Sequence, residues 1–106
     1  MNTFEDYVQK FVDMTNKNEI IWQHSDKVHH VVGIAYECQY KNLVIQIRHY
    51  VLPPYDIITL KVNDANKSEN TDDHGILYTL WIAIGKQLEY FENKKMLETL
   101  SVLDTK

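Results

Sequence analysis

The chain has 106 residues, of which 44% are hydrophobic and 25% charged, and it carries a formal net charge of −4. These values are typical of a single globular domain, here residues 1–106, and they argue against a disordered chain. The mildly acidic balance provides no general attraction for DNA or anionic lipid, so nucleic acid is not the expected partner.

The N-terminus lacks the basic and apolar regions of a secretory signal. The longest apolar stretch, Ile76 to Ile84, is far shorter than the roughly 20 residues that a membrane span needs. We therefore expect a cytoplasmic protein without a membrane partner. Cys38 is the single cysteine and cannot form an internal disulfide, so a reduced, inert thiol is expected.

An amphipathic helix is predicted from about Phe4 to Thr15, with Thr3 placed to cap its first turn. The helical spacing is carried by apolar residues at positions 4, 7, 8, 11 and 12. Asn16 to Asn18 should end the helix, and Ile20 to Trp22 predict a short strand after it.

Residues 31–52 predict a β-hairpin that turns at Lys41-Asn42. A two-residue turn there places Cys38 opposite Ile45 and Tyr36 opposite Ile47, which puts these apolar residues on one face. Slipping the register by one residue would bury charged side chains and expose the apolar ones, so this register is strongly specified.

The second half of the chain predicts a strand at Tyr55 to Val62, after Pro53-Pro54 ends the preceding one. Residues 63–73 are polar and predict a surface loop. A long helix should follow, capped by Asp73 and apolar on one side from Ile76 to Phe91.

Beyond the long helix, Leu97, Leu100 and Leu103 form a stripe that is out of phase with its apolar face. A break near Asn93 and a short last helix would resolve this conflict. The prediction is therefore an α+β fold, α-β-β-β-β-α-α, with a four-stranded antiparallel meander and all helices packed on one face. The expected buried residues include Trp22, Trp81, Phe11 and Leu88.

Five histidines raise the alternative of a small enzyme or metal-binding protein. His24, His29, His30 and His49, with Cys38, lack the paired short spacing of zinc ligands. In the predicted hairpin, Cys38 and His49 are also too far apart for a nucleophile pair. Because no Gly-rich phosphate loop or nucleophile elbow is present, we expect no enzymatic activity, no catalytic residue, no metal and no cofactor.

A protein-interaction module is the favoured function, and a nucleic-acid-binding accessory protein is a further alternative. Apolar and Arg side chains outside the expected core provide two candidate contact surfaces, although a broader core would explain some of them. The predicted partner-binding residues are Val44, Gln46, Arg48 and Tyr50 on the outer hairpin face, and Tyr78 and Ile82 beside the main helical stripe. The partner is a protein of unidentified kind, and a homodimer through this face or a sheet edge is one form of it.

The order of these elements resembles small uncharacterised α+β proteins of low-GC Gram-positive bacteria, their phages and mobile elements. The resemblance rests on the first helix, Thr15, Ile20-Ile21-Trp22, and residues 36–40 and 43–47. It implies an accessory role, such as binding and inhibiting a host or defence protein, and it implies no active site.

Overall fold

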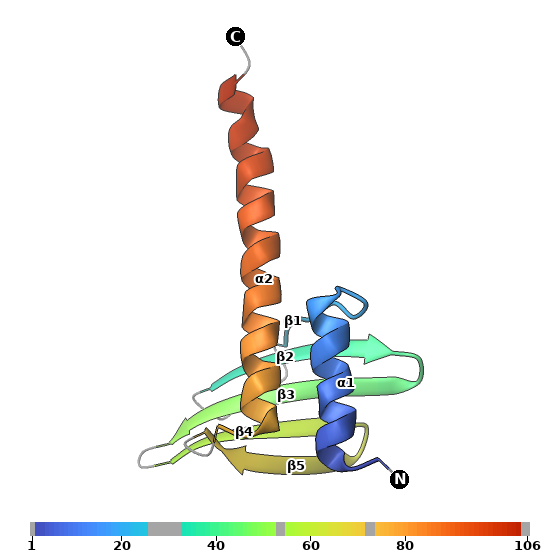
Figure 1. Cartoon of the computed structure of the whole chain (residues 1–106). Coiled ribbons are helices and arrows are strands. Elements are labelled where there is room, and N and C mark those ends of the chain that lie inside the picture. Colours follow the sequence, from blue (N-terminus) through green and yellow to red (C-terminus); the bar gives the residue numbers. More distant parts are fainter. Residues whose placement is uncertain (1, 26–32, 53–54, 72–73, 105–106) are drawn as a thin grey trace.

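The computed structural model describes residues 2–25, 33–52, 55–71 and 74–104. These residues form a five-stranded antiparallel sheet in the order β1-β2-β3-β4-β5, with both α-helices over one face (Figure 1). The elements are α1 (Phe4–Asn16), β1 (Gln23–His24), β2 (Gly33–Tyr40), β3 (Leu43–Leu52), β4 (Tyr55–Val62), β5 (Ala65–Asn70), α2 (Ile76–Leu100) and the 3₁₀ turn η2 (Ser101–Asp104). The predicted α+β class and antiparallel meander are confirmed. The predicted four strands and three helices are wrong in number.

The hairpin of β2 and β3 has the predicted register. Cys38 pairs with Ile45 and Tyr36 with Ile47 across the two strands, and residues 41 and 42 form the turn. Lys41 adopts a left-handed conformation, with φ at 56°. Alternating apolar residues and a two-residue turn specify the same pairing, which is why the sequence predicts it correctly.

The strand predicted at Ile20 to Trp22 is misplaced, because β1 begins at Gln23, one residue after the predicted strand ends. Ile20 and Trp22 are buried while Ile21 is exposed, so the alternation that predicts a strand is present. The backbone N–H of Trp22, however, donates to the side chain of Gln87 on α2. A helix side chain therefore takes the place that a neighbouring strand would fill.

The polar loop predicted at residues 63–73 contains the edge strand β5. It pairs with β4 from Val62–Ala65 to Ile57–Asn70, after a turn at Asn63 and Asp64. Its side chains are polar because most of them are exposed. The hydrogen bonds of β4, rather than any apolar pattern of its own, hold this strand in place.

Helix α1 begins with a reciprocal cap and ends one residue beyond the prediction, at Asn16. The Thr3 hydroxyl accepts from the N–H of Asp6, and the Asp6 carboxylate accepts from the N–H of Thr3. These bonds lower the pKa of Asp6, the backbone N–H of Thr3 having the largest effect. The helix start predicted from Thr3 is therefore confirmed.

The hydrophobic core lies between the helices and the inner face of the sheet. Its buried members include Val8 and Val12 of α1, Cys38, Ile45, Ile47, Ile58 and Leu60 of the sheet, and Leu77, Leu80 and Ile84 of α2. Of the four residues predicted to be buried, Trp22 is 1% exposed. Phe11, Trp81 and Leu88 are only partly buried and pack around this cluster.

Helix α2 is one continuous helix of 25 residues, so the predicted break near Asn93 is wrong. The physical reason is local, since Glu92, Lys94, Lys95 and Met96 all favour helix and residues 86–100 contain no Gly or Pro. The predicted cap, Asp73, lies outside the described residues. The carboxylate of Glu69 on β5 accepts from the N–H of Leu77 at 3.1 Å and fills that role.

The continuous helix makes the molecule elongated. Its extents are 57 × 36 × 24 Å and its radius of gyration is 15.8 Å, against about 13 Å for a compact domain of this length. Figure 1 shows why, because the C-terminal part of α2 extends far beyond the sheet and α1. None of the helices in the described part of the chain is both long and apolar enough to cross a membrane.

Candidate interaction surface on the projecting helix

A buried polar network anchors the lower half of α2. The side-chain amide of Gln87, 5% exposed, accepts from the N–H of Trp22 and donates to the carbonyls of Thr15 and Ile20. The Trp22 indole N–H donates to the Thr15 hydroxyl at 3.0 Å. The network thus connects α2, the end of α1 and the chain leading into β1, which fixes the direction in which α2 leaves the domain.

Above this anchor, every residue of α2 and η2 from 92 to 104 is exposed. We call residues 92–104 the projecting segment. At about 1.5 Å per residue it spans roughly 20 Å. An isolated helix of this length is marginal in water, because it has little packing to offset the entropy of ordering its backbone. Here the segment continues from an anchored helix, so the unfavourable step of forming the first helical turn has already been made.

The projecting segment carries more apolar surface than a solvated helix needs. Leu97 is 69% exposed, Leu103 78%, Met96 57% and Leu100 47%. Tyr90, just below them, is 58% exposed. At 100° per residue these side chains fall on the side of α2 away from Leu80 and Ile84, so the core does not cover them. Exposed apolar side chains gathered in this way make this side of α2 a candidate contact surface.

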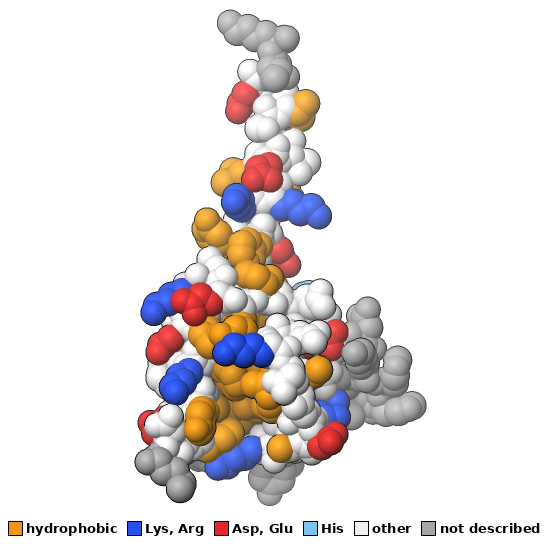
Figure 2. Space-filling view, turned by 90° about the vertical axis from the view of Figure 1, so that its right-hand side faces the viewer, with side chains coloured by type: hydrophobic (Ala, Val, Ile, Leu, Met, Phe, Trp, Pro, Cys, Tyr) orange, Lys and Arg blue, Asp and Glu red, His pale blue; other side chains and the backbone are white. Residues whose placement is uncertain are grey.

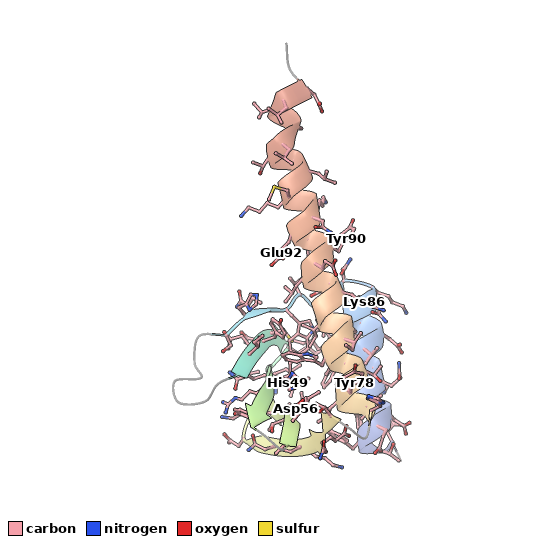
Figure 3. All side chains as sticks on the ribbon, turned by 90° about the vertical axis from the view of Figure 1, so that its left-hand side faces the viewer. His49, Asp56, Tyr78, Lys86, Tyr90 and Glu92 are labelled. Atoms are coloured by element: carbon pink, nitrogen blue, oxygen red, sulfur yellow. The ribbon has the colours of Figure 1, made fainter. Side chains whose placement is uncertain are left out.

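The same side of α2 continues downward into a groove beside α1. Two shallow hollows of about 280 and 270 Å³ lie between the helices and share Asn16, Ala83 and Lys86 in their walls. Tyr78 and Ile82, both predicted to bind a partner, line the lower hollow, and Tyr90 lines the upper one. In Figure 3, Lys86 and Tyr90 lie on the side of α2 toward α1, whereas Glu92 lies on the other side. Groove and projecting segment therefore form one continuous surface.

Figure 2 shows this surface from the side of α1. Hydrophobic side chains gather over the helices of the domain and reappear along the projecting segment, where Lys and Glu side chains interrupt them. Both signs of charge are present there, from Lys94 and Lys95 to Glu92 and Glu98. No continuous basic stripe, of the kind that follows a phosphate backbone, runs along the described part of this helix.

The outer face of the hairpin is the other predicted contact surface, and it is partly internal. Gln46 is buried, at 6% exposed, with its amide donating to the hydroxyl of Ser25. Arg48 is half-buried and donates to the Gln46 side chain and the Tyr50 hydroxyl. Of the four predicted residues on this face, Val44 is the one with a largely exposed apolar side chain, at 49%. The polar side chains of this face form hydrogen bonds with one another. Fewer of their polar groups are therefore available to a partner than the strand alternation predicts.

The titratable residues considered for catalysis are spread over the inner face. His24 stacks on Tyr36, with ring centroids 4.9 Å apart, and His49 packs edge-on against Trp81 at 5.2 Å. His29 and His30 lie outside the described residues. Within the described ranges, no three His, Cys, Asp or Glu side chains lie close enough together to hold a metal ion.

The surroundings of Cys38 and His49 are those of packed core side chains and require no catalytic role to explain them. Desolvation, with a smaller effect from the Glu37 carboxylate, raises the pKa of the Cys38 thiol to about 12. A thiol that stays protonated at neutral pH is a poor nucleophile. The Nε2 atom of His49 is buried and has no hydrogen-bond partner among the described groups, so this ring acts as packing against Trp81.

Two features of this surface were not predicted from the sequence. The sequence predicts the stripe of Leu97, Leu100 and Leu103 on a separate packed helix, whereas the structure exposes it on α2 itself. The available signal was its phase, since an apolar stripe that changes side on an uninterrupted helix must face something other than that helix's own core. The anchor residue Gln87 had a weaker signal, a lone polar side chain within the apolar face of α2.

Comparison with known proteins leaves the surface to be interpreted from its own geometry. No protein-family model, no curated protein and no solved structure matches this chain.

Proposed function

We propose that this chain is a non-enzymatic protein-interaction module whose binding element is the projecting segment of α2 with the groove below it. One observation carries the proposal, namely that helix α2 continues beyond the sheet with Leu97, Leu100 and Leu103 exposed. Amphipathic helices of this kind bind by laying their apolar side chains into a groove or against another helix. The accessory role expected from the resemblance, inhibition of a host or defence protein, would require such a surface.

The arrangement of the domain supports this role. Gln87 and its partners hold the lower half of α2 rigidly, so the upper half is presented at a set angle rather than as a loose tail. A helix that is ordered before it binds loses less entropy on binding than a disordered segment does. The domain holds the helix in a fixed orientation, and the helix makes the contact.

Site-specific photo-crosslinking tests the proposal directly. A photoreactive amino acid replaces Leu97 in one variant and Val44 in the other, so that the helix and the hairpin face are compared at exposed apolar positions. In cells that express the chain from its own gene, we expect protein adducts from position 97 and few from position 44. Adducts from position 44 alone would move the contact surface to the hairpin. An absence of adducts from both positions would overturn the proposal.

A further inference from the structure

We infer that the occupant of the projecting segment is a second copy of this chain, paired with it in an antiparallel two-helix contact. This inference rests on the proposed function and names its partner. It starts from the spacing of six exposed residues on α2 and η2, which alternates between four and three. They are Lys86, Tyr90, Asn93, Leu97, Leu100 and Asp104. This spacing places the first five along one line of α2, as in the seam of a coiled coil, and Asp104 follows them in the 3₁₀ turn η2 at its end.

The seam is complementary to itself when the second helix runs the opposite way. A two-fold axis beside position 95 sets Tyr90 level with the partner's Leu100, and Asn93 level with the partner's Leu97. The same axis brings Lys86 level with the partner's Asp104, so an opposite-charge pair closes each end. Because the contact is two-fold symmetric, each of these residue pairs occurs twice in the dimer.

Charge decides between the two directions of pairing. In a parallel pair, Lys86 would face the partner's Lys86 and Asp104 the partner's Asp104, so both ends would hold like charges. The antiparallel direction exchanges both repulsions for attractions. Met96 and Leu103, exposed beside the seam, add apolar contact along one of its edges.

The shape of the molecule accommodates this contact. α1 runs beside the lower half of α2 and ends at Asn16, so the position directly above it along α2 is open (Figure 1). The partner's helix would occupy that position and end at the upper hollow of about 280 Å³, whose walls include Lys86 and Tyr90. The two sheets lie at opposite ends of the helix pair, so neither obstructs the other.

The oligomeric state of the purified full chain is the first test. By sedimentation equilibrium and light scattering we expect a dimer at micromolar concentration. Leu97→Asp should raise the dimer dissociation constant at least about 100-fold, because it replaces an apolar side chain of the seam by a carboxylate in both copies. Val44→Asp is the matched control and should leave the dimer intact. A wild-type monomer, or a dimer that Val44→Asp dissociates and Leu97→Asp does not, would overturn the inference.

Disulfide trapping tests the direction of the helices. Tyr90→Cys and Leu100→Cys variants, mixed and oxidised, should form a crosslinked heterodimer. Either variant alone should not, because two residues at position 90 lie about 15 Å apart along an antiparallel pair. Crosslinking of each variant with itself, and not in the mixture, would show a parallel pair and overturn the antiparallel arrangement.

Charge exchange tests the end pairs. Lys86→Glu and Asp104→Lys should each weaken the dimer about three- to ten-fold, and the double variant should restore most of the affinity. Two additive losses would contradict the pairing of Lys86 with the partner's Asp104. A monomer in these assays together with crosslinks to another protein from position 97 would remove the second copy and leave the proposed function standing.

Discussion

The two halves of helix α2 differ in what surrounds them, although they belong to one uninterrupted element. The lower half places Leu77, Leu80 and Ile84 in the core, each with 0% of its surface exposed. The upper half exposes leucines to solvent. The contrast shows that the same residue type is buried in the core in one half and exposed in the other, according to its position relative to the domain.

A matched pair of leucine truncations should show the difference between the two halves most clearly. Leu80→Ala removes a fully buried side chain and should lower the free energy of unfolding by about 2 to 5 kcal/mol. Leu97→Ala, in the same helix, should change it by no more than about 0.5 kcal/mol in dilute protein. Urea unfolding followed by circular dichroism measures both. A large loss for Leu97→Ala at a concentration where the chain is monomeric would mean that the projecting segment packs on its own domain.

Removing the anchor of the lower half should have the next largest effect. Gln87→Leu leaves the N–H of Trp22 and the carbonyl of Ile20 buried without their partner, and should cost about 2 to 4 kcal/mol. Gln39→Leu, at an exposed glutamine on β2, is the control and should be close to neutral. Equal stability of the two variants, measured by chemical unfolding, would show that the network contributes nothing.

A smaller effect is expected at the first turn of α2. Glu69→Ala removes the carboxylate that accepts from the Leu77 N–H and should cost about 1 kcal/mol. Gly75→Ala should cost a similar amount, because a β-carbon at that position would collide with the Glu69 carboxylate. In a double-mutant cycle the double variant should lose less stability than the sum of the two single losses, since both substitutions remove the same cap. Full additivity would show that they act separately.

The last effect appears only at alkaline pH. Burial raises the pKa of the Cys38 thiol from its ordinary value of 9.0 to about 12, so the unfolded chain loses this proton at lower pH than the folded one. The contribution of this thiol to the free energy of unfolding is therefore fully present below about pH 9 and declines as the pH rises towards 12. Cys38→Ala should be less stable at neutral pH and show a shallower decline. An unchanged slope in unfolding titrations from pH 8 to 11 would contradict the shift. The pKa of Tyr36 is also raised, chiefly by burial, and should remain as a second contribution in the variant.

The sequence predicts those parts of the fold in which several local signals agree. The β2–β3 register follows from alternation on two strands and the turn between them. β5 has no such agreement, because its residues are polar on both faces and its pairing depends on β4 alone. The apolar residues of α2 are evident in the sequence, but their change of phase predicts a break, whereas the structure continues the helix with the second stripe exposed. Gln87 could not be assigned, since its four partners lie more than 60 residues away in sequence.

The edge strand β5 has a consequence for how the protein avoids aggregation. An exposed edge offers unpaired backbone groups on which another chain can extend the sheet, and such growth has no natural end. Here two charged residues of β5 turn toward the helices. Lys67 lies over the Phe4 ring at 4.1 Å, and Glu69 is held by α2. A strand approaching this edge would have to tolerate both charges at close range. β5 therefore discourages open-ended stacking of sheets, whereas the helix pairing proposed above would close on itself.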